Sequence, residues 1–176
     1  MESLTLAVER PSLAHPVESP TRFPGSLLIA ARERAAAEGE RPIEALEALS
    51  TLEPAAFIRA LGATLHYPVL EASSLFKCTP EFDQVSLAQA LKREFVMLRH
   101  DDTLIGVFAD PFDDARLAWI DECLQGAGLY LCHAADLRAY LARQEEGFQA
   151  VAALGTHGDE QHEYDNLESL SLTSIS

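Results

Sequence analysis

Apolar residues in the first half of the chain recur at the three- and four-residue spacing of helices that bury one face. Three helices are predicted there. One has Ser26 as its N-cap, and the others start at Pro42 and Pro54, since proline fits the first position of a helix. Tyr67 precedes a proline, which favours extended backbone, so "YPVL" is predicted as a short strand. These elements predict a helical subdomain over residues 25–80.

The second half of the chain alternates short apolar runs with helical patterns. The runs "FVMLRH" and "LIGVFA" are separated by a short polar stretch, which predicts an antiparallel hairpin, and "LYLCHA" is predicted as a third strand. Helices are predicted over "SLAQALKRE", "PFDDARLAWIDECLQG" and "AADLRAYLARQEEG". The resulting order, α-β-β-α-β-α, predicts an α+β fold: a small sandwich with a mostly antiparallel sheet over residues 81–149, after the helical subdomain.

The two ends of the chain have a different composition. Residues 1–24 contain four prolines, too many for a helix, and are too polar for a core strand, which predicts a flexible leader. Residues 150–176 contain five acidic residues, no lysine or arginine and few apolar anchors, which predicts an acidic linker. The final "LESLSLTSIS" has no cap, turn signal or aromatic anchor.

Composition and charge argue against several classes of function. The 176 residues are 48% hydrophobic, which predicts a folded protein with one sizeable core. The formal net charge of −15 argues against binding to nucleic acid or to an anionic membrane, because both favour basic surfaces. No run approaches the roughly 20 apolar residues of a membrane-spanning helix. The N-terminus does not resemble a signal peptide, and three cysteines without CxxC spacing favour a reducing cytosol. We therefore expect a cytoplasmic protein without direct membrane insertion.

The stretch "IGVFADPFDDARLAWID" contains an apolar run, three aspartates around a proline, and then an amphipathic segment. Asp110 follows an apolar strand, and Asp113 or Asp114 lies where the next helix needs an N-cap. A metal site would need more converging carboxylates or an EF-hand pattern, which is absent from the sequence. We therefore interpret these aspartates as capping and turn residues.

Two further groups could carry chemistry. His157 and His162 lie near two glutamates, which allows a surface metal contact but lacks the fixed geometry of a zinc site. Cys132 and His133 are adjacent on a predicted strand and therefore point to opposite faces, which favours a core cysteine and an exposed histidine. The sequence contains no GxxxxGK[ST], GxSxG, HExxH or GxGxxG motif. We expect no catalytic residues, no metal and no cofactor in this chain.

The strings "GVFADPFDDARLAWI" and "LYLCHAADLRAYLARQEE" together resemble the N-terminal domain of type II secretion and type IV pilus assembly ATPases. "EPAAFIRALGATLHYPVL" is similar to an earlier helix-and-strand element of that domain, and the resemblance covers roughly residues 26–176. It implies a non-catalytic docking or regulatory domain that contacts the cytoplasmic part of an inner-membrane platform protein. The phosphate-binding loop, Mg²⁺-binding acids and zinc-binding cysteines of such ATPases would belong to a motor domain that this chain lacks.

Two functional hypotheses follow from the resemblance. The first is an adaptor located in the cytoplasm, peripheral to the inner membrane through its partner, with Phe112, Trp119 and Tyr140 as possible interface residues. The alternative for Trp119 is that it fills the core between helix and sheet. The second hypothesis is a sensor of cyclic di-GMP, which some relatives bind through an "RLG"-led motif. Here the corresponding region reads "ARERAAAEGERPIEALEALSTL", and "RALG" at Arg59–Gly62 matches the motif only in part, which favours the adaptor.

Overall fold

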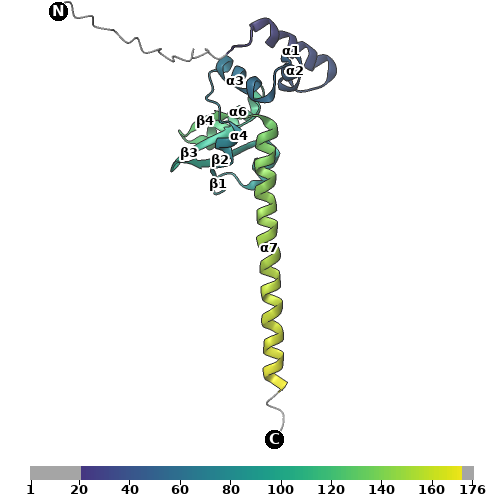
Figure 1. The fold of residues 1–176 in the computed structure, drawn as a ribbon, viewed down its shortest axis with the longest axis vertical. Coiled ribbons are helices and arrows are strands. Elements are labelled where there is room, and N and C mark those ends of the chain that lie inside the picture. The colour runs from purple at the N-terminus through teal and green to yellow at the C-terminus, as the bar shows by residue number, and fades with distance from the viewer. Residues whose placement is uncertain (1–20, 172–176) are drawn as a thin grey trace, which may run out of the picture.

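The structure, a computed structural model, describes residues 21–171, with side chains described up to residue 155. A group of helices lies at one end, a sheet lies beside it, and one long helix runs out of the body (Figure 1). The elements are α1 (Gly25–Glu38), α2 (Pro42–Ser50), α3 (Pro54–Leu65), α4 (Ala72–Leu75), β1 (Thr79–Glu81), α5 (Leu87–Arg93), β2 (Phe95–His100), β3 (Thr103–Phe108), α6 (Asp114–Leu124), β4 (Gly128–Leu131) and α7 (Ala134–Ser171). The predicted α+β class is confirmed.

The sheet has the strand order β1-β2-β3-β4. β1 and β3 both pair antiparallel with β2, and β4 pairs parallel with β3, so the mostly antiparallel sheet is confirmed. The predicted hairpin is β2–β3, whose register opposes Phe95 to Phe108 and whose turn places Asp101 and Asp102 at positive φ. β1 was not predicted, because "TPE" is short and contains a proline.

Neither outer strand of the sheet offers a long row of free backbone hydrogen-bonding groups. Beyond β4, the Leu131 amide donates to the Pro68 carbonyl over 2.8 Å, and the Leu70 amide donates to the Leu131 carbonyl over 2.9 Å. The predicted strand "YPVL" is therefore an isolated parallel bridge between Val69 and Leu131. At the other edge, β1 has three residues and contains Pro80, which has no amide hydrogen to donate.

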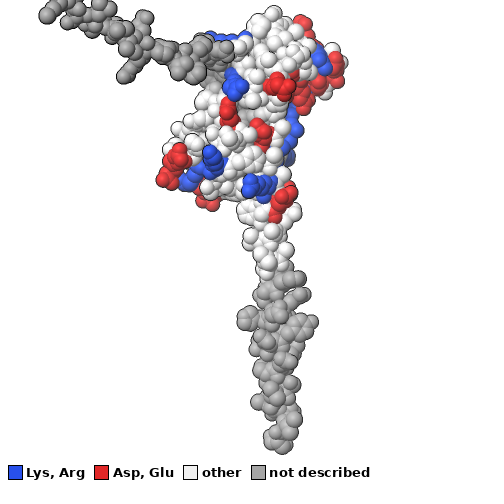
Figure 2. Space-filling view, viewed as in Figure 1, with Lys and Arg blue, Asp and Glu red and all other residues white. Residues whose placement is uncertain are grey.

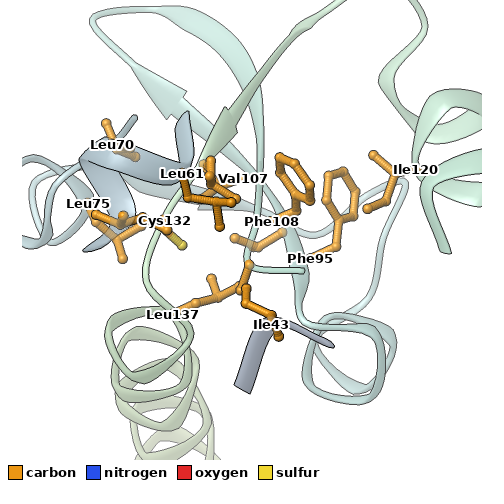
Figure 3. Close-up of a cluster of buried hydrophobic side chains, with 14 of the residues drawn as sticks. Ile43, Leu61, Leu70, Leu75, Phe95, Val107, Phe108, Ile120, Cys132 and Leu137 are labelled. Carbon is orange, nitrogen blue, oxygen red and sulfur yellow. The ribbon is translucent and has the colours of Figure 1, made fainter. Parts of the chain in front are cut away.

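Buried residues on both sides of residue 80 form one hydrophobic cluster. Figure 3 shows Leu61 from α3 beside Val107 and Phe108 from β3, with Phe95 from β2 next to Phe108. The helical part and the sheet therefore share one core. Its largest fully buried side chains are Tyr140, Phe57, Phe95, Phe108, Leu46, Leu61, Leu75, Met97, Leu98, Ile120, Leu131 and Leu137.

The N-terminal boundaries differ slightly from the prediction. α1 begins at Gly25 with Pro24 as its N-cap, so Ser26 is helical and does not cap the helix. The predicted leader lies outside the described residues up to residue 20. Phe23 is buried, its ring centroid lies 5.7 Å from that of Phe57, and its amide donates to Thr64 Oγ1 over 2.8 Å. The core therefore begins before the first helix.

The last helix is longer than the sequence predicts. It was expected to end near Gly147 and to give way to a linker at residue 150, whereas the α7 backbone is continuous from Ala134 to Ser171. A glycine inside a helix costs only about 1 kcal/mol relative to alanine, and alanine-rich neighbours offset part of that cost. Within residues 21–171, no helix combines the length and apolar content needed to cross a membrane.

Candidate functional site

The aspartates after β3 cap and shape the turn into α6. Asp113 Oδ1 accepts a hydrogen bond from the Arg116 amide over 3.0 Å, which confirms Asp113 as the N-cap. Asp110 is buried, and its Oδ1 accepts from the Phe112 amide over 3.0 Å, as in an Asx turn. Asp114 is exposed in the first turn of α6. Among the described residues, no group of three or more histidine, cysteine, aspartate or glutamate side chains could hold a metal ion.

Asp110 also belongs to a group of charges at the junction of four helices, which we call the Glu94 cluster. Glu94 follows α5, and its carboxylate accepts from Arg41 Nη1 over 2.9 Å, from Arg116 Nη1 over 3.4 Å and from Arg138 Nε over 3.2 Å. Arg41 Nη1 lies 3.6 Å from Asp110 Oδ2. Because these arginines come from α6, α7 and the residue before α2, Glu94 links three parts of the chain that are far apart in sequence.

The surroundings of Glu94 and Arg41 favour the ionised forms of these two side chains. Burial raises the pKa of Glu94, but the hydrogen bonds and charges of Arg41 and Arg138 lower it by more, so the net pKa lies below the ordinary value. Burial lowers the pKa of Arg41, but Glu94 and Glu44 raise it by more. Glu94 itself has φ +50° and ψ 48°, a left-handed conformation that costs a non-glycine residue roughly 1–2 kcal/mol. Its ion pairs therefore stabilise an unfavourable backbone.

A cavity of about 240 Å³ lies beside this cluster. It is bordered by Arg41, Arg138 and the pair formed by Glu47 and His133. His133 Nδ1 accepts from the Ala135 amide over 3.1 Å at the start of α7, so Nε2 carries the hydrogen and donates to Glu47 Oε1 over 2.7 Å. His133 was expected to be exposed. Its side chain is only 12% exposed, and it contacts both Glu47 of α2 and the ring of Phe57, whose centroid lies 6.4 Å away.

This arrangement favours a structural role for the junction. The three guanidinium groups share the Glu94 carboxylate, and three further carboxylates, Glu44, Asp110 and Asp113, lie within 3.6 Å of Arg41 or Arg116. Four carboxylates therefore face three arginines, which leaves no net positive charge for an anionic ligand. Cys132 is buried as predicted, and burial raises the pKa of its thiol far above the ordinary value, which keeps it in the non-nucleophilic form. The geometry therefore suits holding helices together better than bond-breaking chemistry.

The three proposed interface residues contact different parts of the core. Phe112 is partly buried and packs against the core. Trp119 lies edge-on to Phe95, with ring centroids 5.6 Å apart, and the Arg93 guanidinium lies 4.4 Å above its ring. Tyr140 is only 1% exposed. These contacts favour the core alternative for Trp119 and make Tyr140 a core residue of this chain.

An open apolar surface lies elsewhere, between α5 and α7. A groove of about 480 Å³ is lined by Phe82, Ser86, Leu87, Ala88, Leu91, Glu145 and Phe148. Leu91 is 38% exposed and Phe148 is 55% exposed, although the Phe148 ring contacts the Phe82 ring at a centroid distance of 5.8 Å. Glu145 is the charged residue among those that line the groove.

The apolar surface continues along α7 as the helix leaves the body. Val151 is 69% exposed and Leu154 is 75% exposed. Residues 147–155 contain no charged side chain, and Figure 2 shows this part of α7 as an uncharged band below the charged body. We call this groove and band the α5–α7 surface, made by Phe82, Leu87, Leu91, Phe148, Val151 and Leu154. Sequence reasoning missed it, although the uncharged string "GFQAVAALG" within an acidic region was a usable signal.

Comparison with known proteins finds similarity to solved structures. No family model matches the chain, and no curated protein matches it. A solved structure described as "Structure of MshE with cdg" is similar, with 22% sequence identity and a TM-score of 0.48. The similar region covers 67% of this chain and 87% of that chain.

Proposed function

We propose that this chain is a non-catalytic docking or regulatory domain, of the kind that precedes the motor in type II secretion and type IV pilus assembly ATPases. Its partner would be the cytoplasmic part of an inner-membrane platform protein, which would place the chain in the cytoplasm at that membrane. The sequence strings that carry the resemblance form β3, the Asp110 turn, α6, β4 and the start of α7. A strand, an aspartate-proline turn, a helix, a strand and a final helix, in this order, are what the resemblance to the ATPase N-terminal domain implies.

The observation that carries the proposal is the exposed α5–α7 surface. Large apolar side chains grouped on one face are unfavourable in water, and such groups commonly mark sites where another molecule binds. Phe148, Val151 and Leu154 follow one another at three-residue spacing on a helix that extends beyond the body (Figure 1). A docking domain needs such a surface, whereas the charged groups of the junction are already paired with one another.

Binding of the cognate platform protein tests the proposal. The cytoplasmic part of that protein is titrated into the full chain by isothermal calorimetry, and Phe148→Ser is compared with Ile29→Ser. Ile29 is 60% exposed on α1, so it is a matched apolar control away from the surface. We expect wild type and Ile29→Ser to bind equally and Phe148→Ser to bind at least about tenfold more weakly. Absence of binding by wild type, or equal binding by all three proteins, would contradict the proposal.

The second candidate is a cyclic di-GMP sensor, and the observation in its favour is the junction cavity with two arginines at its border. Arg41 and Arg138 would have to exchange Glu94 for the phosphates of the ligand. Calorimetric titration with cyclic di-GMP, with ATP as the control, decides between the candidates. A dissociation constant of about 1 μM or below for the dinucleotide alone would favour the sensor. No heat with either nucleotide would favour the adaptor.

A further inference from the structure

We propose that the α5–α7 surface binds an amphipathic helix with an apolar centre and basic residues at both ends. This inference rests on the proposed function, in which the surface docks a partner, and it specifies the chemistry of that partner. The proposal follows from three properties of the described residues and of the sequence that continues them: the shape of the surface, its charge, and the consequence of that charge for self-association.

The shape of the surface fits a helix. The groove between α5 and α7 presents Leu91 and Phe148 on its two walls, and the apolar side chains continue to Val151 and Leu154 along one helix. From Phe148 to Leu154 the helix rises about 9 Å, and the groove extends the apolar contact beyond that length. A partner helix recognised in this way presents apolar anchors at three- and four-residue spacing.

Charge selects a basic partner. Glu145 lines the groove, and Glu146 is exposed beside it. After Arg143 the sequence contains seven acidic residues and no lysine or arginine, and the next acidic residues after Glu146 are at positions 159 and 160. The uncharged apolar stretch therefore has acidic residues before and after it in the sequence, separated by about 20 Å of helix. Basic residues spaced to match would gain favourable charge contacts at both ends.

The same charges disfavour a second copy of this chain as the occupant. Parallel pairing of two α7 helices would set Glu145 and Glu146 against the same residues of the other copy. Antiparallel pairing over the uncharged stretch would set them against acidic positions 159 and 160. Both arrangements oppose like charges, and the net charge of −15 adds a general repulsion between copies.

Two designed peptides test the charge and shape requirements. Each is a labelled amphipathic helix of about 18 residues with the same leucine face, and its end residues are lysine in one peptide and glutamate in the other. Fluorescence anisotropy measures binding of each peptide to the full chain at about 50 mM and about 500 mM salt. We expect the lysine peptide to bind at least about tenfold more tightly at low salt, and the difference to shrink at high salt.

Matched variants connect the binding to named residues. Phe148→Ser should abolish binding of the lysine peptide, and Ile29→Ser should leave it unchanged. The double variant Glu145→Lys with Glu146→Lys should reduce or reverse the preference between the peptides, and circular dichroism checks that each variant is folded. Equal binding of both peptides would overturn the inference. A dimer of the chain in sedimentation equilibrium that Phe148→Ser dissociates would overturn it as well, because the second copy would then be the occupant.

The outcome separates the inference from the proposed function. Binding of the platform protein without binding of the lysine peptide would overturn the inference and leave the docking function standing. Failure of both the platform protein and the peptide to bind would overturn both.

Discussion

Substitution of Glu94 by glutamine removes one negative charge from the Glu94 cluster and keeps the size of the side chain. The carboxylate of Glu94 is 16% exposed and accepts from three arginines at 2.9–3.4 Å. Glutamine at this position keeps an acceptor oxygen but loses the charge that makes these hydrogen bonds strong. The left-handed backbone at Glu94 then loses part of the interaction that stabilises it.

The loss of stability expected for Glu94→Gln depends on how far its three partner arginines are exposed to solvent. Arg41 and Arg116 are 34% and 19% exposed, so their pairs with Glu94 are partly shielded from water. Arg138 is 57% exposed, and solvent screening makes its pair worth little. We expect Glu94→Gln to lower the free energy of unfolding by about 1–2 kcal/mol at pH 7.

Urea unfolding at several pH values measures this loss and its pH dependence. Burial raises the pKa of Glu94, but the arginines lower it by more, so the folded-state pKa is below that of the unfolded chain. The carboxylate therefore stabilises the fold fully above the unfolded value of about 4.3, and this contribution is lost as pH falls through the lower folded pKa. The difference between wild type and Glu94→Gln should be largest at pH 7 and should shrink in acid.

An exposed pair provides the control for this experiment. Glu38 is 57% exposed and lies 3.3 Å from Arg34 within α1, so Glu38→Gln should change the free energy of unfolding by less than about 0.5 kcal/mol. Equal stability of wild type and Glu94→Gln at pH 7 would refute the reasoning. A difference that persists undiminished at about pH 3 would refute it too, because the ionised carboxylate would then not be its source.

Three further predictions concern the fold. Asp113→Ala removes the N-cap of α6 and should lower the free energy of unfolding by about 0.5–2 kcal/mol in urea. Tyr140→Phe removes the hydroxyl that donates to the Cys78 carbonyl over 3.0 Å and should lower the free energy of unfolding by about 1 kcal/mol. Because burial raises the pKa of Tyr140, one tyrosine of the wild type should ionise at a higher pH than the others in an alkaline absorbance titration. Gly106→Ala places a Cβ 2.9 Å from the Phe95 ring and should lower the free energy of unfolding by about 1–3 kcal/mol, which a lower thermal midpoint would show. An unchanged midpoint would show that the neighbouring side chains move to make room for the methyl group.

Local signals in the sequence predicted much of the fold. The β2–β3 hairpin followed from two apolar runs around a polar turn, and the Asp113 cap followed from its place between a strand and a helix. Proline at the first position of α2 and α3 located the starts of both helices. In each case the residues that determine the structure are neighbours in sequence, so a local sequence pattern is enough to predict it.

Features that depend on distant partners were not predictable in the same way. β1 exists because Pro80 and its neighbours pair with β2, although their own composition argues against a strand. Single hydrogen bonds within the Glu94 cluster join residues up to 53 positions apart, and no local pattern distinguishes these charges from those of solvated helix faces. The α5–α7 surface arises because Leu91 and Phe148 meet across two helices, so the sequence shows the apolar stretch but not the groove beside it.

The two outer strands of the sheet limit how a peptide could bind to it by adding a strand. A peptide that binds by adding a strand needs a free row of backbone donors and acceptors along an outer strand. Here β4 already pairs with the segment around Val69, and β1 offers three residues interrupted by Pro80. Such edges discourage both strand addition and edge-to-edge aggregation. The docking that we propose therefore uses side chains on helices, so a partner could bind without a change in the sheet.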